Sequence, residues 1–266
     1  MLGAHGVIPM RDPHVVTLSY IASPSESASF DQAPPLEGTI EDIRFLLHHG
    51  QLRIEPIIHF SSVEDARRYV DPLLEAWEID IALRLGSPEL TFKYDTAEVI
   101  DRDPPPPGDR QVVLVASVGE FSLAGSVVAL HVSRAKYPEP PPTFRTSPDV
   151  DTLWKRYQGY RQGREPLQSM AYFCLTLLEA ITGSRYNAAK TFKISGRVLG
   201  KIGQLSSERG DTSTARKYRA ITAGAPLTGF EANWLEEAVK AIIRRAGELH
   251  AIDAVNTINL NDLPSL

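Results

Sequence analysis

The sequence predicts an α+β fold in which a mostly antiparallel β-sheet domain with one main helix precedes an all-helical bundle. Apolar and polar residues alternate along several segments of the first half, as they do in half-buried strands. A single long helical pattern interrupts these segments. Beyond a cluster of prolines, apolar residues recur at helical spacing almost to the last residue. The cluster is Pro138, Pro140, Pro141, Pro142 and Pro148.

The first half is expected to supply most of the strands. Alternation predicts strands at residues 15–20, 38–47 and 51–60, and His49-Gly50 predicts the turn between the last two. A loop rich in Ser and Pro fills residues 23–35. Further strands are expected at residues 90–100, 111–117 and 120–133, after a stiff tetraproline at 104–107. Together with one helix, the expected order is β-β-β-α-β-β-β.

The helix of the first half is predicted over residues 61–85. Ser61 and Ser62 are candidate N-caps, and acidic residues follow in the first turn. Gly86 is positioned to end the helix. Pro72 lies inside the pattern, so we expect a kink or a break there.

The second half is expected to be helical to about residue 253. Asp149 or Asp151 would cap a helix that runs to Gln162, and Pro166 would begin another that Gly183 ends. Further helices are predicted at 185–192, 195–206, 212–222 and 228–249, and an extended tail at 258–264. The predicted domains are an acidic 1–137, a proline-rich, protease-accessible linker 138–148, and a basic 149–266.

The two halves differ in charge. Residues 1–150 hold 12 Lys+Arg and 22 Asp+Glu, whereas residues 151–266 hold 16 and 11. Within the second half, residues 185–219 hold nine basic and two acidic residues. This asymmetry favours a polyanionic partner for the basic part, or pairing between the halves, while a solvated helix surface would explain it equally well.

Composition excludes several classes of protein. With 42% hydrophobic and 23% charged residues and no apolar run long enough for a membrane span, the chain is typical of a globular protein. The single cysteine, Cys174, precludes an internal disulfide and reads as a core residue, so a cytoplasmic location is expected. No secretory signal is expected, and no phosphate-binding, dinucleotide-binding or metalloprotease motif occurs, so no cofactor is expected. His48-His49 lacks further ligands at metal-binding spacing, so no metal site is expected.

Residues 188–202 resemble a helix-turn-helix. Ala189 fits the small position where the helices cross, Phe192 and Ile194 would bracket the turn, and Ser195 would cap the second helix. Lys193 stands where such turns often carry glycine. The resemblance implies that the outer face of the second helix offers Arg197, Lys201 and Gln204 to a phosphate backbone or a groove, although a helical hairpin inside a bundle has the same spacing. The basic segment as a whole is expected to bind RNA or DNA through five basic residues. They are Arg185, Lys190, Lys193, Arg197 and Lys201.

Arg244-Arg245-Ala246-Gly247-Glu248-Leu249-His250 resembles the HEPN ribonuclease motif, in which an Arg precedes a His near the end of a late helix. That resemblance implies a homodimeric, metal-independent endoribonuclease with Arg245 and His250 as catalytic residues. Ala246 replaces the polar residue usual after the arginine. The alternative is structural: an ion pair between Arg244 and Glu248, with His250 at a frayed helix end.

Several short motifs spread over residues 60–266 resemble the methylamine-utilisation J family and related bacterial proteins. They are Ala76-Trp77-Glu78-Ile79, Val99-Ile100-Asp101-Arg102, Gly163-Arg164-Glu165-Pro166-Leu167, Met170-Ala171-Tyr172-Phe173, Glu208-Arg209-Gly210-Asp211, Ile242-Ile243-Arg244-Arg245 and Leu260-Asn261-Asp262-Leu263-Pro264. The family implies no established activity. We therefore expect an accessory or binding protein whose basic domain engages RNA, DNA or a protein partner. The acidic domain would be a second interaction module, a homodimer could form through the helical domain, and no membrane association is expected.

Overall fold

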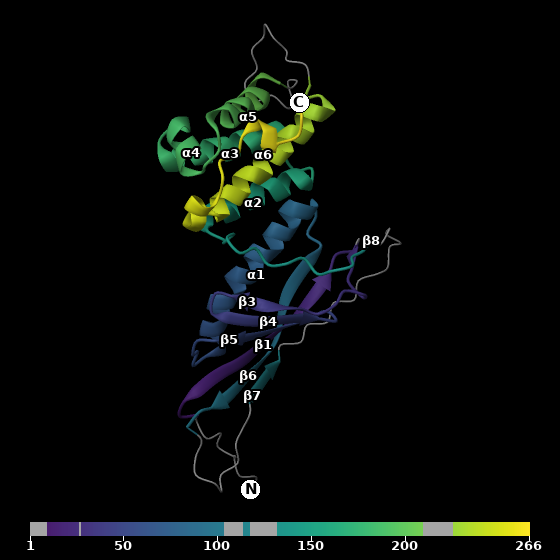
Figure 1. Cartoon of the computed structure of the whole chain (residues 1–266), viewed down its shortest axis with the longest axis vertical. Coiled ribbons are helices and arrows are strands. Elements are labelled where there is room, and N and C mark those ends of the chain that lie inside the picture. The colour runs from purple at the N-terminus through teal and green to yellow at the C-terminus, as the bar shows by residue number, and fades with distance from the viewer. Residues whose placement is uncertain (1–9, 27, 104–113, 118–131, 210–225) are drawn as a thin grey trace. The chain divides into compact units, whose positions relative to one another are not determined.

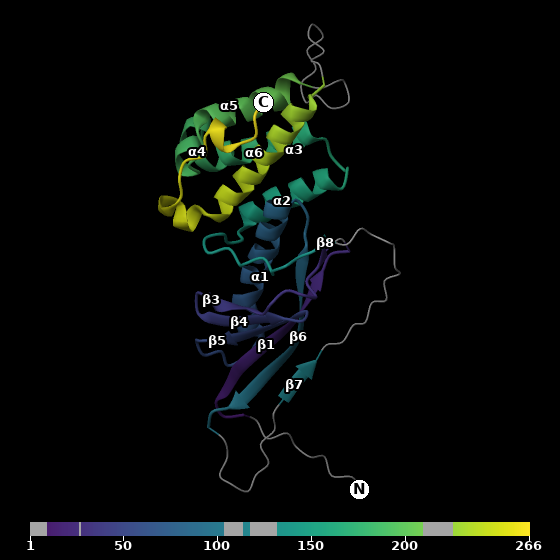
Figure 2. The same ribbon diagram turned by 45° about the vertical axis from the view of Figure 1, so that its right-hand side comes forward.

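The computed structural model describes residues 10–26, 28–103, 114–117, 132–209 and 226–266. It divides the chain into two compact units, residues 1–142 and residues 143–266 (Figures 1 and 2). The first unit contains an antiparallel sheet with a long helix, and the second is helical. The predicted α+β class is confirmed.

The sheet of the first unit contains six strands in the order β3-β4-β5-β1-β6-β7 within the described residues, and all neighbours are antiparallel. The strands are β1 (Pro13–Pro24), β3 (Leu36–Ile40), β4 (Ile43–His48), β5 (Gln51–Pro56), β6 (Leu90–Asp101) and β7 (Leu114–Ser117). A short parallel pair, β2 (Ala28–Ser29) and β8 (Val132–Ser133), lies apart from it. The rest of the hairpin predicted at 111–133 lies outside the described residues.

A bulge sets the faces of β1. Strand residues normally alternate between faces, yet Val15 and Leu18, three positions apart, are both buried. The pairing of β1 with β6 shifts register between Val15 and Thr17, and this extra residue brings Leu18 back to the inner face. The buried alternation then continues through Tyr20 and Ala22.

The segment expected as one strand at 38–47 is a hairpin. β3 and β4 meet at a two-residue turn, Glu41-Asp42, where Glu41 adopts φ 49°. The prediction was wrong because that turn contains neither glycine nor asparagine, the residues that usually supply a positive φ. Gly38 lies opposite Phe45, and a Cβ at residue 38 would stand 3.0 Å from the Phe45 ring.

The turn predicted at His49-Gly50 is confirmed. Both residues have positive φ, 48° and 72°, which suits the right-handed twist of the strands that flank it. Strand β5 ends at Pro56, earlier than the expected residue 60, because proline cannot donate to a ladder.

Helix α1 (Val63–Leu85) crosses the position of Pro72 without a break in its assignment. Ser62 caps its start by accepting from the amide of Asp65, and Gly86 ends it with φ 78°. The expected break is absent because residues on both sides of Pro72 are held in the core, among them Val70, Leu73 and Leu74.

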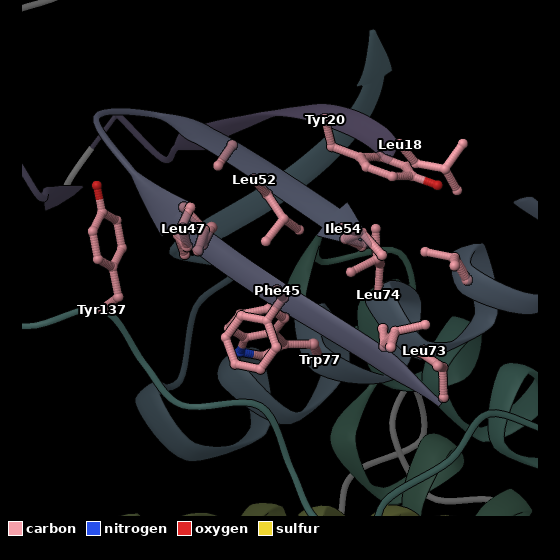
Figure 3. Packing of buried hydrophobic residues seen from close by; sticks show 14 of the residues in the cluster. Leu18, Tyr20, Phe45, Leu47, Leu52, Ile54, Leu73, Leu74, Trp77 and Tyr137 are labelled. Atoms are coloured by element: carbon pink, nitrogen blue, oxygen red, sulfur yellow. The ribbon is translucent and has the colours of Figure 1, made fainter. Parts of the chain in front are cut away.

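Trp77 on α1 is at the centre of the first core (Figure 3). Its ring meets Phe45 edge to face at 5.4 Å and Phe92 at 4.9 Å. Its indole N–H donates to the carbonyl of Pro138 at 3.0 Å, so the polar end of the ring is satisfied. Burial of this side chain therefore fixes the segment that follows the sheet as well as the sheet itself.

The second unit contains helices with defined caps. They are α2 (Pro148–Arg161), α3 (Leu167–Thr182), α4 (Arg185–Thr191), α5 (Gly196–Glu208) and α6 (Gly229–Gly247), followed by the 3-10 turns η1 (Leu249–Ala254) and η2 (Leu260–Asp262). Ser147, and not Asp149 or Asp151, caps α2. Helix α3 contacts each of the other α-helices of this unit and contributes the buried Cys174 to its core. The helix predicted at 212–222 lies outside the described residues.

The proline-rich segment is anchored at both ends. Pro138 and Glu139 accept hydrogen bonds from Trp77 and Arg84 of α1. On the other side, Phe144 is buried, and the amide of Arg145 donates to the carbonyl of Gly247 at 2.9 Å. Little of the expected linker is therefore free of hydrogen bonds to one unit or the other. Its sensitivity to protease stays a prediction.

The buried carboxyl of Glu78 should make the unfolding free energy of the first unit depend on pH. Burial raises the pKa of this carboxyl to about 7, against the opposing effect of the Phe92 amide, which donates to Oε1 at 2.5 Å. Because the folded pKa lies above the ordinary value, its stabilising contribution is present at pH 4.5 and is lost as pH rises through 7. Glu78→Gln keeps the acceptor and should raise the unfolding temperature at pH 8, with little change at pH 5. Glu98→Gln, at an exposed position, serves as control. Scanning calorimetry measures the unfolding temperature of each variant, and an equal shift in both would contradict this account.

Two glycines of the second unit should respond oppositely to alanine. A methyl group at Gly247 would overlap the buried Phe144 ring, whereas one at Gly200 on α5 meets nothing within 4 Å. We expect Gly247→Ala to destabilise the unit by about 1–3 kcal/mol through overpacking. Gly200→Ala should stabilise it by about 0.5–1 kcal/mol through helix propensity. Urea unfolding followed by circular dichroism measures both, and a stabilised Gly247→Ala variant would be the contrary result.

Candidate nucleic-acid interface

The predicted helix-turn-helix segment forms the hairpin α4–α5 (Figures 1 and 2). Ser184 and Ser195 cap the two helices by accepting from the amides of Asn187 and Val198. Lys193 in the turn has φ 45°, the left-handed conformation that glycine adopts most readily. The left-handed residue of the turn therefore occurs at the position where the sequence pattern would place it.

The inner side of the hairpin is apolar, as expected. Phe192 and Ile194 bracket the turn and are fully buried, as are the α5 residues Leu199 and Ile202. Ala188, and not Ala189, is the buried small residue of α4. The spacing of the pattern was thus off by one residue on the first helix.

The hairpin is basic throughout. Residues 185–207 contain five Lys or Arg and no Asp or Glu. The structure distinguishes these five by what their charged groups contact. Those with an acidic neighbour are partly neutralised, and those without contribute more to the local potential.

Arg185 and Lys193 have acidic neighbours outside the hairpin. Arg185 Nε donates to Glu179 at 2.6 Å, and its guanidinium lies across Gly203, where an added Cβ would approach to 3.0 Å. Lys193 Nζ lies 3.8 Å from Asp253. Both basic residues therefore contribute to packing of the second unit as well as to its charge.

Within the described residues, Arg197, Lys201 and Lys190 form no ion pair with an acidic side chain. Arg197 is exposed on α5, and Lys201, one turn later, contacts only the amide of Gln204 at 3.2 Å. Lys190 Nζ lies 4.4 Å above the centre of the Tyr186 ring. These three cations, with the exposed aromatic ring, form what we call the basic face. Tyr186 was missed at the sequence level because an isolated tyrosine on a helix has no distinguishing pattern.

The C-terminal segment closes the turn between α4 and α5. Ile258 pairs with Ile194 as a parallel bridge: its carbonyl accepts from the Ser195 amide, and its amide donates to the Lys193 carbonyl, both at 2.8 Å. The tail predicted to be extended at 258–264 contains the turn η2, and η1 precedes it at the end of the stretch predicted to be helical. The backbone amide of Ser195, at the start of α5, is therefore already hydrogen-bonded to Ile258.

Arg245 and His250 occupy different surroundings from those expected. Arg245 lies in α6 and is only 9% exposed. Its guanidinium pairs with Glu248, the residue expected to pair with Arg244, and donates to the carbonyl of Asn256 at 2.6 Å. His250 is exposed in η1, because α6 ends at Gly247 rather than at residue 249. These contacts give Arg245 a role in tying the tail to α6.

A second polar cluster joins α2 to α6. Glu236 accepts from Tyr157, Tyr160 and Arg161 at 2.8, 3.0 and 2.9 Å. Burial raises the pKa of Tyr160 to about 12, and the three donors lower the pKa of Glu236 against the effect of its burial. All groups in the cluster are bonded to one another, so it stabilises the bundle.

His59 pairs with His14. The ring centres are 5.0 Å apart, the planes are inclined by 17° and the Nδ1 atoms are 2.9 Å apart, so the rings meet through these nitrogens. Arg102, which can only donate, lies 3.2 Å from His59 Nδ1, so the proton between the rings belongs to His14. Burial, His59 and Arg102 lower the pKa of His14.

This pair is a hydrogen-bonded junction between segments 45 residues apart. The guanidinium of Arg102 lies 3.2 Å from the same nitrogen of His59. Among the described residues, no group of three or more His, Cys, Asp or Glu is arranged to hold a metal ion. His48 and His49 form a separate ring contact in the turn between β4 and β5.

No family model, no curated protein and no solved structure matches the chain. The resemblances to the methylamine-utilisation J family and to the HEPN motif therefore stay predictions. In the part of the chain that the structure describes, none of the helices combines the length and apolar character needed to cross a membrane.

Arg245 and Arg244 provide a matched pair for testing the structural role of this position. Arg245→Ala removes the buried partner of Glu248 and the donor to Asn256, so we expect a loss of about 3 kcal/mol in unfolding free energy. Arg244→Ala, at the less buried neighbouring position, should cost less than about 1 kcal/mol. Chemical unfolding measures both. Similar small losses in the two variants would contradict a structural role for Arg245 and favour its expected role at a catalytic site.

Proposed function

We propose that the chain is a non-enzymatic nucleic-acid-binding protein that contacts phosphates through the basic face of α4–α5. The observation that carries the proposal is a hairpin with five basic and no acidic residues over 185–207. Within the described part of the chain, three of the five, Arg197, Lys190 and Lys201, form no ion pair with an acidic side chain. Five positive charges in this short segment attract a polyanion at long range.

Phosphate contact explains why these residues need not form a cavity. Side chains on a convex helix surface can contact the phosphates of a nucleic-acid backbone. Binding then gains free energy from the counterions that the phosphates release. Gly196 and Gly200 flank Arg197 on α5 without neighbours within 4 Å. The sugar-phosphate backbone of a nucleic acid can therefore approach this part of α5 closely.

The engagement of Arg245 supports the non-enzymatic form of the proposal. The ribonuclease alternative needs a guanidinium that contacts the substrate phosphate, and that of Arg245 is held by Glu248 and by the carbonyl of Asn256. A protein partner for the acidic first unit stays a prediction, since none of the contacts described above carries it.

The test is salt-dependent binding of the full chain to a fluorescein-labelled oligonucleotide, followed by anisotropy. Affinity should fall steeply with added salt, and Arg197→Glu with Lys201→Glu should weaken binding at least tenfold at low salt because two phosphate contacts become repulsive. The slope of log affinity against log salt should also become shallower by roughly 2.

Lys155→Glu is the control, since Lys155 is an exposed basic residue of the same unit on α2. It makes the same change in net charge per residue and should alter affinity much less. Absence of binding by the unaltered protein at low salt would overturn the proposal, as would equal losses in the α2 and α5 variants.

A further inference from the structure

We infer that the basic face takes single-stranded nucleic acid, with Tyr186 as a stacking platform for a base and Lys190 beside it for the adjoining phosphate. This inference rests on the proposed function and names the class of ligand for the same surface. It combines two observations. One is the exposed ring of Tyr186 on α4, and the other is the contact of the C-terminal segment with the turn between α4 and α5.

Tyr186 on α4 is 68% exposed, so most of its ring lies in solvent. Its side chain therefore adds little to the core of the second unit. The ammonium of Lys190 lies 4.4 Å from the ring centre, four residues along the same helix. A ring that carries a cation over one face matches a nucleotide, because a base can stack on the opposite face while its phosphate pairs with the ammonium.

Duplex binding in the manner of a helix-turn-helix would place the start of α5 in a major groove. Two features of the turn before α5 disfavour that arrangement. The Ser195 amide is already bonded to Ile258, and the exposed carboxylate of Asp253 lies 3.8 Å from Lys193. A duplex brought to the turn would set its phosphates against this carboxylate. A flexible single strand can instead follow α4 and the exposed side of α5.

The exposed aromatic Phe230 provides a comparison. It is 74% exposed at the start of α6, next to the acidic residue Glu231. In the described residues no cation lies over its ring, in contrast to Tyr186. A stacking platform for a polyanion requires both the ring and the positive charge, so Phe230 serves as the matched control.

The experiment measures binding of the full chain to three labelled probes: an oligothymidine of about 20 nucleotides, a duplex of equal length, and heparin, a polyanion without bases. We expect tighter binding to the single strand than to the duplex. Tyr186→Ala should weaken single-strand binding by about tenfold and Tyr186→Phe should retain it. Neither change should affect heparin binding or the unfolding temperature, and Phe230→Ala should affect no probe.

The outcomes separate the inference from the proposed function. Salt-sensitive binding that is equal for single strand and duplex, or a Tyr186→Ala loss that is the same for heparin or no larger than that of Phe230→Ala, overturns the single-strand inference and leaves the proposed function standing. Failure of the unaltered protein to bind any of the three probes at low salt overturns both.

Discussion

The second unit depends on the contacts of one buried guanidinium. Arg245 pairs with Glu248 at the end of α6 and donates to the carbonyl of Asn256 in the tail. Two residues later, both backbone groups of Ile258 are hydrogen-bonded to the α4–α5 turn, its amide to the carbonyl of Lys193 and its carbonyl to the amide of Ser195. The conformation of the basic hairpin is therefore linked through the tail to the end of a helix far from it in sequence. An arginine that a sequence motif suggests as catalytic is placed to tie the tail to the end of α6.

The sequence predicted what depends on local periodicity and capping. The helices at 61–85 and 195–206, the turn at His49-Gly50 and the end of α3 at Gly183 are all visible as patterns of a few residues. The turn at Glu41-Asp42 was missed because its left-handed residue is a glutamate. The continuity of α1 through Pro72 was missed because tertiary packing overrides the tendency of proline to break a helix.

The candidate site was predictable in composition but not in the state of each residue. Five basic residues at 185–201 can be read from the sequence, whereas the neutralisation of Arg185 by Glu179 and of Lys193 by Asp253 depends on how helices and tail fold back. The pairing of His14 with His59 likewise joins segments 45 residues apart. Tyr186 becomes informative only once its exposure and the position of Lys190 are known.

The left-handed conformation of Lys193 has a consequence for how the sequence can vary. An L-residue in this conformation costs about 1–2 kcal/mol relative to the right-handed one, which glycine avoids. Glycine in exchange loses more backbone entropy on folding, by roughly 0.5–1 kcal/mol. Because the two effects only partly offset each other, the backbone of this turn favours glycine over lysine by about 1 kcal/mol. Related sequences would therefore be free to lose the positive charge at residue 193 to glycine without refolding the hairpin.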